Sequence, residues 1–215
     1  MPLPSLLGVF AHPDDEALVA GEVLAQHSAS GARTAVVTTT WAPGTPRAAE
    51  LAGALAALGA GGPRMLGYAD HRVPDSAPGR PRLCDAPLDE VVGRLVGQLR
   101  GFRPRIVVTH DAYGQLTGHP DHRHTHRVTV LAVAAAGLEH LYPEAGAPWQ
   151  PHALYAATHP HSALGGVRKV APAPQRPARA LAAPGERPST PSTRSSARHA
   201  ESTHLGAPPS GSWGS

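Results

Sequence analysis

The sequence lacks the features that mark several common classes of protein. Its 215 residues include one cysteine, Cys84, which excludes an intrachain disulfide and suits a reducing compartment. No apolar run approaches the length of a membrane-spanning helix. The amino terminus also has no basic region followed by a long apolar one, as a secretory signal would. We therefore predict a cytoplasmic protein without membrane insertion.

An excess of positive charge is missing from most of the chain. Residues 1–170 balance acidic and basic side chains, and the formal net charge of +3 comes from the arginines of residues 171–215. A nucleic-acid-binding domain usually carries a basic patch on its folded part. The balance within residues 1–170 therefore predicts that nucleic acid is not a partner.

Proline and glycine, in contrast, are abundant, with 24 and 23 residues. Residues 171–215 consist mostly of proline, alanine, serine, threonine, glycine and arginine, with few large apolar side chains. Such a segment buries too little surface to offset the entropy of ordering the chain. We predict one folded domain at residues 1–170 and a disordered tail at residues 171–215, for which a basic interaction arm is the alternative.

Between these ends, short apolar runs alternate with stretches of helical periodicity. Strands are predicted at residues 6–10, 33–39, 64–68, 105–109 and 152–158, and helices at residues 17–27, 46–58, 88–102 and 125–141. Residues 70–84 are proline-rich and irregular. Strands separated by helices predict an α/β fold, a Rossmann-like three-layer sandwich whose mostly parallel sheet is covered on both faces.

The first cluster of chemically useful side chains follows the first predicted strand. Residues 11–16 read Ala-His-Pro-Asp-Asp-Glu, so an imidazole and three carboxylates lie at the carboxyl end of a strand, where α/β folds bind ligands. Adjacent carboxylates repel one another, and a metal cation or a proton relay is the usual reason for such a cluster. The alternative is that the acids only favour the dipole of the following helix.

A second cluster follows the fourth predicted strand and weighs against that alternative. His110 and Asp111 end this strand, and residues 118–126 read Gly-His-Pro-Asp-His-Arg-His-Thr-His. If Pro120 opens a helix, His119 and His122 are three residues apart and can share one face. Both clusters then meet at the same edge of a parallel sheet. Two histidines and one carboxylate there can bind a divalent metal and leave positions for water and substrate.

Together the two clusters resemble the motifs of the LmbE-like family of metal-dependent de-N-acetylases. This family includes the N-acetylglucosaminyl-phosphatidylinositol deacetylase and the bacterial enzymes of mycothiol and bacillithiol synthesis. The resemblance extends to Arg47 and Glu50, which match an Arg-x-x-Glu helix, and to the Gly-Tyr-Ala-Asp sequence of residues 67–70. It covers about residues 6–160, and the family's carboxyl-terminal helical portion is not recognisable in this chain.

The resemblance implies a ligand set and a general base. His12, Asp15 and His122 would bind the metal, Zn²⁺ in the first place, with Fe²⁺ compatible with the same ligands. Asp14 would accept a proton from the metal-activated water and then pass it to the departing amine.

The resemblance also implies roles for residues around the reacting amide. His119 in its protonated form would stabilise the oxyanion, and Asp121 would favour that imidazolium. Arg47 and Asp70 resemble residues that contact the sugar or its appendage. One position departs from the pattern, because Thr117 stands where related bacterial enzymes often have a tyrosine.

These features predict a metal-dependent hydrolase that removes the N-acetyl group from an N-acetylglucosamine-type conjugate, a small molecule. Two alternatives stay open: an amidase acting on a thiol-conjugate amide, and a non-catalytic, truncated family member. His126 could support the site or only pack on its helix. We expect no catalytic role for Cys84, which has no histidine or basic neighbour in the sequence.

Overall fold

The computed structural model describes residues 3–159. The strands are β1 (Leu6–Phe10), β2 (Thr34–Thr40), β3 (Arg64–Tyr68), β4 (Ile106–His110) and β5 (Ala153–Ala157). The helices are α1 (Asp15–Ala29), α2 (Pro46–Ala57), α3 (Leu88–Phe102) and α4 (Pro120–Ala136), with short 3₁₀ turns η1 (Pro74–Ser76), η2 (Leu83–Asp85) and η3 (Pro143–Ala145). Within this part of the chain, no helix has both the length and the apolar character of a membrane span. The predicted tail lies outside the described residues.

The five strands form one sheet in the order β3-β2-β1-β4-β5, and every neighbouring pair is parallel. β1 is central, with Leu6 in register with Thr34 of β2 on one side and with Ile106 of β4 on the other. The chain first builds the half of the sheet formed by β1, β2 and β3, and then crosses over to add β4 and β5 on the other side of β1. The point at which the strand order reverses therefore lies between β1 and β4. Ligands of open α/β sheets bind at this switch point, beyond the carboxyl ends of the strands.

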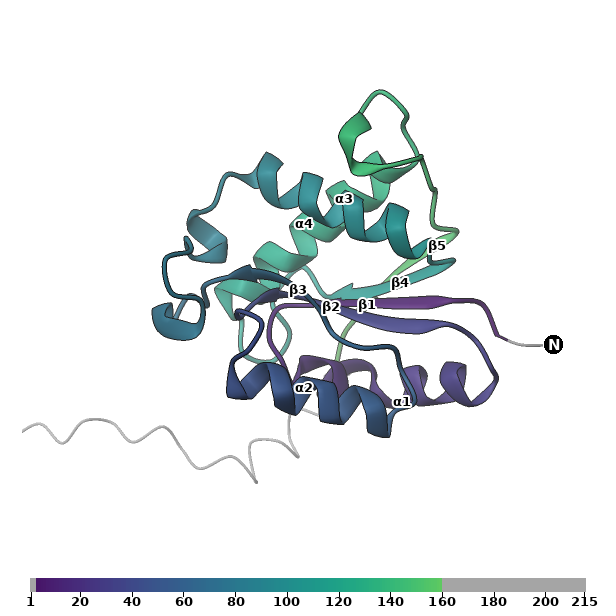
Figure 1. The fold of residues 1–215 in the computed structure, drawn as a ribbon, viewed down its shortest axis with the longest axis horizontal. Coiled ribbons are helices and arrows are strands. Elements are labelled where there is room, and N and C mark those ends of the chain that lie inside the picture. The colour runs from purple at the N-terminus through teal and green to yellow at the C-terminus, as the bar shows by residue number, and fades with distance from the viewer. Residues whose placement is uncertain (1–2, 160–215) are drawn as a thin grey trace, which may run out of the picture. The chain divides into compact units, whose positions relative to one another are not determined.

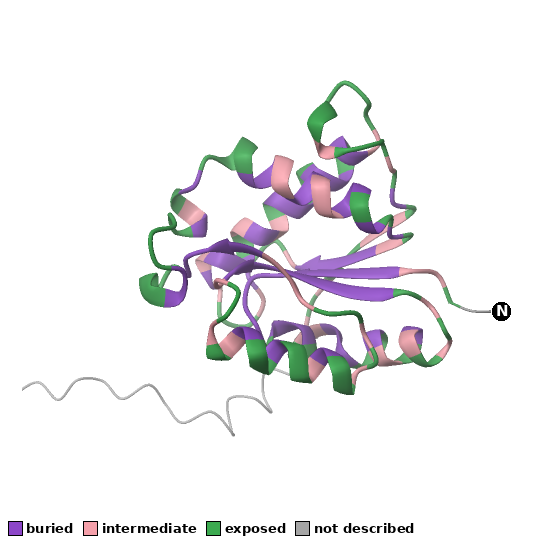
Figure 2. Cartoon of the chain, in the orientation of Figure 1, coloured by how far each residue is buried: buried purple, intermediate pink, exposed green. Residues whose placement is uncertain are grey.

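Helices cover both faces of the sheet and confirm the predicted three layers. Figure 1 shows α3 and α4 on one face and α1 and α2 on the other. β1 and β2 are buried along their whole length, while the helices expose the side turned away from the sheet (Figure 2). Strands buried on both faces are rich in apolar residues, which explains the continuous apolar runs in the sequence.

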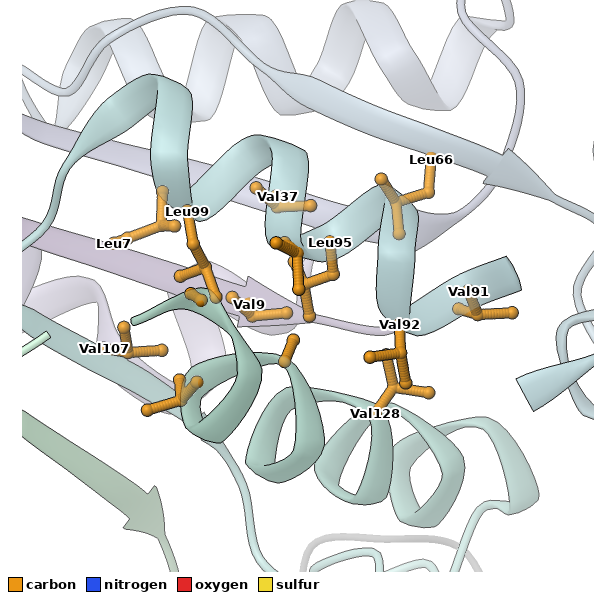
Figure 3. Close-up of a cluster of buried hydrophobic side chains, with 14 of the residues drawn as sticks. Leu7, Val9, Val37, Leu66, Val91, Val92, Leu95, Leu99, Val107 and Val128 are labelled. Atoms are coloured by element: carbon orange, nitrogen blue, oxygen red, sulfur yellow. The ribbon is translucent and has the colours of Figure 1, made fainter. Parts of the chain in front are cut away.

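The larger part of the core lies between the sheet and the pair α3 and α4. The apolar side chains along one stripe of α3 pack against inward-facing side chains of the strands (Figure 3). The residues labelled in that figure are Leu7, Val9, Val37, Leu66, Val91, Val92, Leu95, Leu99, Val107 and Val128. A second cluster on the opposite face joins α1 and α2 to the sheet through Leu6, Phe10 and Val36. Both clusters keep β1 and β4 side by side.

The boundaries of α4 differ from the sequence prediction. The helix was expected at residues 125–141, and it runs from Pro120 to Ala136. Proline fits the first turn of a helix because its missing N–H needs no partner there. The side chain of His119 accepts a hydrogen bond from the backbone N–H of Asp121 and caps the helix, which ends before Gly137. The earlier start places His122 in the first turn, close to the end of β4.

A buried arginine holds the segment that links α4 to β5. Arg100 of α3 is 3% exposed, and its guanidinium donates only to backbone carbonyls of this segment. The acceptors are the carbonyl oxygens of Ala136, Leu138, Leu141, Tyr142 and Gly146, at 2.6–3.1 Å. A planar guanidinium presents five N–H donors in a fixed geometry, so one side chain can satisfy all of these carbonyls.

We expect Arg100→Lys to lower the free energy of unfolding by roughly 2–5 kcal/mol. An ammonium group cannot reach all five carbonyls, and each buried acceptor left without a partner costs about 1–3 kcal/mol. The measurement is the midpoint of urea unfolding, with the exposed Arg33→Lys as the control. Equal midpoints for the two variants would contradict this role for Arg100.

Candidate metal centre

The turn after β1 brings His12 and Asp15 into the protein interior. Asp15 is the first residue of α1, and its Oδ2 accepts the backbone N–H of His12 at 2.8 Å. His12 and Asp15 are 8% and 6% exposed. A carboxylate in the first turn of a helix is favoured by the helix dipole, and here it also anchors the preceding turn. The neighbouring Glu16 is buried as well but contacts only the backbone N–H of Asp14.

His12, Asp15 and His122 bring their donor atoms close together, with a different carboxylate oxygen of Asp15 near each histidine. His12 Nδ1 lies 3.2 Å from His122 Nε2 and 3.3 Å from Asp15 Oδ2, while His122 Nε2 lies 3.4 Å from Asp15 Oδ1. Ligand atoms bound about 2.0–2.2 Å from a tetrahedral Zn²⁺ ion lie roughly 3.3–3.5 Å apart. These donor types and separations are compatible with a divalent metal, and Nδ1 of His122 has no hydrogen-bond partner within residues 3–159. Taking one ligand atom from each residue, three groups have all their atoms within 4.8 Å of one another: His12, His119 and His122; His12, Asp70, His119 and Asp121; and Asp15, His110 and His122.

The second nitrogen of His12 faces two carboxylates. Nε2 lies 2.9 Å from Asp70 Oδ2 and 3.3 Å from Asp121 Oδ2. Burial lowers the pKa of His12, but the carboxylates of Asp121, Asp15 and Asp70 outweigh it and raise the pKa to about 11. These carboxylates make the centre strongly attractive to a cation. A histidine that binds metal through one nitrogen commonly donates the other N–H to a carboxylate, which orients the ring.

Neighbouring imidazoles also hold the carboxylate of Asp15 in its charged form. Burial raises the pKa of Asp15, but contacts with His110, His12 and His122 outweigh burial and hold the pKa far below its usual range. Metal binding needs a deprotonated carboxylate and neutral imidazoles, so an ion in this centre would displace the extra proton that the raised pKa gives His12.

Asp121 has no exposed surface and is held from three sides. Its Oδ2 accepts the backbone N–H of His71 at 2.9 Å and lies 3.3 Å from His12 Nε2. Its Oδ1 accepts the thiol of Cys84 at 3.2 Å. Burial raises the pKa of Cys84 to about 12, with this hydrogen bond adding to the effect, so the thiol stays protonated and acts as a donor.

Asp121 lies near His119, whose protonated form it was expected to favour, but no hydrogen bond joins its carboxylate to the ring. The carboxylate lies 3.8 Å from His119 Nδ1, too far for a hydrogen bond. That nitrogen instead accepts the backbone N–H of Asp121 at 3.2 Å. Burial and the nearby His12 lower the pKa of His119 to about 4, because the opposing effect of Asp121 is smaller. Because Nδ1 accepts this hydrogen bond, the proton of the neutral ring of His119 resides on Nε2.

The loop between β4 and α4 places His119 at the site. Gly118 donates its N–H to the carbonyl of Gly114 at 3.0 Å, and both glycines have positive φ angles. A Cβ at Gly114 would lie 2.9 Å from the backbone carbon of Gly118, so the loop closes only with glycine there. Thr117 accepts the backbone N–H of His119 at 3.3 Å, and Tyr113 is 83% exposed. Among the described residues, neither Thr117 nor Tyr113 forms a hydrogen bond between its side chain and the side chains of the histidines and aspartates of the centre, so neither takes the place of the family's tyrosine.

His110, to which the sequence assigned no role, belongs to the cluster. It is fully buried, and its Nε2 accepts the backbone N–H of Ala11 at 2.9 Å and lies 3.4 Å from Asp15 Oδ2. Its ring stacks on His122 with centroids 4.1 Å apart and an interplanar angle of 4°. His126 donates from Nδ1 to the carbonyl of His110 at 2.8 Å. His126 thus supports the end of β4 and does not enter the cluster.

Asp14 points away from its neighbour Asp15. Its carboxylate is partly exposed and accepts Arg47 Nη2 at 2.7 Å, and its backbone has a φ angle of 123°, which is strained for a residue with a side chain. The guanidinium of Arg47 also contacts Glu50 at 3.3 Å and lies over the ring of Trp41, 5.6 Å from its centroid. Trp41 directly follows β2, so its position at a strand end was a usable signal that the sequence prediction missed.

A cavity of about 470 Å³ opens onto these side chains. Its walls include all of the sequence-predicted site residues except Asp121, which lies behind His12. Those residues are His12, Asp14, Asp15, Arg47, Asp70, His119 and His122. Trp41, Leu116 and Thr117 complete part of the wall. The structure therefore brings the two sequence clusters and the residues from the loops after β2 and β3 to one place.

The fold and this centre define a class of protein. A parallel α/β sheet carries a cluster of histidines and aspartates at its switch point, and three overlapping groups of these side chains have the spacing of metal ligands. The chain belongs to the PIG-L family, whose model is described as GlcNAc-PI de-N-acetylase and matches residues 7–133. The family expected from the two sequence motifs is thereby confirmed.

Curated relatives support this membership. A protein of Rhodococcus jostii (strain RHA1) is 38% identical over 213 residues, covering 86% of this chain and 72% of the relative. A protein of Mycobacterium leprae (strain Br4923) is 42% identical over 184 residues, covering 71% of this chain and 59% of the relative. Both are named 1D-myo-inositol 2-acetamido-2-deoxy-alpha-D-glucopyranoside deacetylase. The matches thus span 72% and 59% of the length of these two relatives.

Among solved structures, the fold is similar to that of the conserved protein TT1542 from Thermus thermophilus. The TM-score is 0.56 at 30% sequence identity, and the match covers 74% of this chain and 68% of the other. The resemblance is therefore one of fold as well as of sequence.

Proposed function

We propose that this protein is a metal-dependent hydrolase that removes the acetyl group from an N-acetylglucosamine conjugate. The observation that carries the proposal is the close approach of the side chains of His12, Asp15 and His122, beside the partly exposed carboxylate of Asp14 on a cavity wall. Family membership and the names of the two relatives support an acetamide as the reacting group. The single cysteine supports a cytoplasmic location.

His12, Asp15 and His122 would hold the metal, for which we propose Zn²⁺; Fe²⁺ suits the same ligands. When bound, the ion would lower the pKa of a water molecule and polarise the amide carbonyl. Asp70 and Asp121 would hold the ring of His12 by accepting its Nε2–H. Asp121 would thereby act through His12, in addition to the expected effect of its charge on the pKa of His119, which it raises.

Asp14 would be the general base and then the general acid. Its carboxylate lines the cavity and is partly exposed, so it can accept the proton that the attacking water loses. It would then donate that proton to the nitrogen of the departing amine. The ion pair with Arg47 would orient the carboxylate toward the cavity.

His119 would stabilise the oxygen of the amide carbonyl as negative charge develops on it. Its Nδ1 is engaged with the helix backbone, which leaves Nε2–H as the donor available to the cavity. A neutral imidazole can supply this hydrogen bond, so the reaction does not require the protonated form expected from the sequence.

Arg47 and Asp70 would contact the sugar hydroxyl groups. Both side chains line the cavity. Arg47 belongs to the first turn of α2, and Asp70 follows β3. Charged side chains form strong hydrogen bonds with polar ligands. Because Arg47 and Asp70 also contact Asp14 and His12, sugar binding and the orientation of the reacting groups would be coupled.

The test is an amine-release assay on the full chain with the inositol conjugate that the relatives' name specifies. We expect turnover with bound Zn²⁺, a loss of more than about tenfold after chelation, and recovery when Zn²⁺ is added back. A thiol-conjugate amide serves as the second substrate. Turnover of that amide alone would support the amidase alternative, and no turnover of either compound by the metal-loaded protein would contradict a hydrolase.

A further inference from the structure

A second cavity of about 600 Å³ lies on the face of α4 away from the candidate metal centre. We call it the α4 cavity; its polar lining comes from Arg123, His124, His126, Arg127 and Cys84. No residue lines both this cavity and the one at the metal centre. Its volume lies within the range of about 300–1,000 Å³ that is typical of small-molecule sites.

The charged side chains that line the α4 cavity are all basic. The lining contains two guanidinium groups and two imidazoles and no carboxylate. Within residues 3–159, the side chains of Arg123 and Arg127 form no ion pair, whereas Arg47 has two acidic partners. Two like charges four residues apart on a helix destabilise it slightly, so the pair gains from an anion placed between them.

The position of the α4 cavity along the helix also favours an anion. Pro120, the first residue of α4, lines the cavity, so the cavity reaches the amino-terminal turn of the helix. Negative charge near this turn is favoured by the helix dipole.

We propose that the α4 cavity binds a phosphate-bearing small molecule, with the phosphate held by Arg123 and Arg127. Guanidinium groups bind phosphate through paired hydrogen bonds, and residues four apart on a helix project from the same face. The aliphatic side chains of Val130 and Leu131, which are 40% and 42% exposed, would contact the carbon part of the ligand. The proposal does not depend on the hydrolase activity.

Titration calorimetry of the full, metal-loaded chain with inorganic phosphate at constant ionic strength tests the proposal. We expect saturable binding that is weaker by about tenfold or more in Arg123→Gln/Arg127→Gln. The matched control is Arg33→Gln/Arg103→Gln, which removes the same charge from residues that line neither cavity. Its affinity for phosphate should equal that of the unaltered chain.

A third variant separates the two cavities. Arg47→Gln removes the arginine of the metal-centre cavity and should leave phosphate binding unchanged. The absence of binding by the unaltered chain would overturn the proposal. So would binding that survives in Arg123→Gln/Arg127→Gln, or a loss in Arg47→Gln. Melting curves of every variant establish that each remains folded, and none of these results depends on whether the protein hydrolyses an acetamide.

Discussion

His122→Ala should purify as a folded protein that has lost its stoichiometric metal. His122 Nε2 lies 3.2 Å from His12 Nδ1 and 3.4 Å from Asp15 Oδ1, and the two remaining proposed ligands would hold Zn²⁺ far more weakly. The side chain lies at the carboxyl edge of the sheet, outside both apolar clusters, so its removal leaves the core intact. The measurement is elemental analysis of the purified protein, paired with its melting curve.

The exposed His140 provides a matched control for this experiment. His140→Ala removes the same side chain from a position that lines neither cavity, and it should keep the full metal content. If His122→Ala also retained one equivalent of metal, the proposed ligand set of His12, Asp15 and His122 would be wrong. If it lost metal and unfolded together, the centre would contribute to the stability of the fold.

The sequence predicted the sheet because its signals are local. The limits of β3 and α3 matched the prediction, α3 from a clear apolar stripe and β3 from a much weaker signal in a short run between turn residues. The convergence of His12 and His122 followed from topology, because parallel strands bring their carboxyl ends to one edge. Prediction failed at α4, where Pro120 opened a helix earlier than the apolar pattern suggested.

The contacts of Asp121 depend on long-range folding and could not be predicted. Its donors, His71 and Cys84, belong to the segment between β3 and α3, which has no periodicity and returns to α4 from a distance in the sequence. The same holds for His110, whose role depends on a stacked ring and on the backbone N–H of Ala11. Motifs indicate which residue types gather at a site, whereas hydrogen-bond partners are set by how irregular segments fold.

Asp14→Asn should keep its metal and lose most of its activity. Asparagine has nearly the same shape as aspartate and tolerates unusual backbone conformations, so the strained φ angle of 123° should be retained. Its amide oxygen can still accept a hydrogen bond from Arg47, but it cannot take the proton of the attacking water. Loss of a general base typically lowers kcat by about 10²–10⁴-fold. The measurements are kcat in the amine-release assay and metal content by elemental analysis.

Asp15→Asn is the companion variant, since the two acids are adjacent and point in different directions. Asp15 lies against His12, His110 and His122, and a neutral amide oxygen is a poorer ligand for a dication than a carboxylate. We expect this variant to lose metal, and excess Zn²⁺ should restore part of its activity. The same addition should do nothing for Asp14→Asn. If zinc instead rescued Asp14→Asn, Asp14 would be the metal ligand and Asp15 the general base. Full activity in both variants would exclude this centre as the site of hydrolysis.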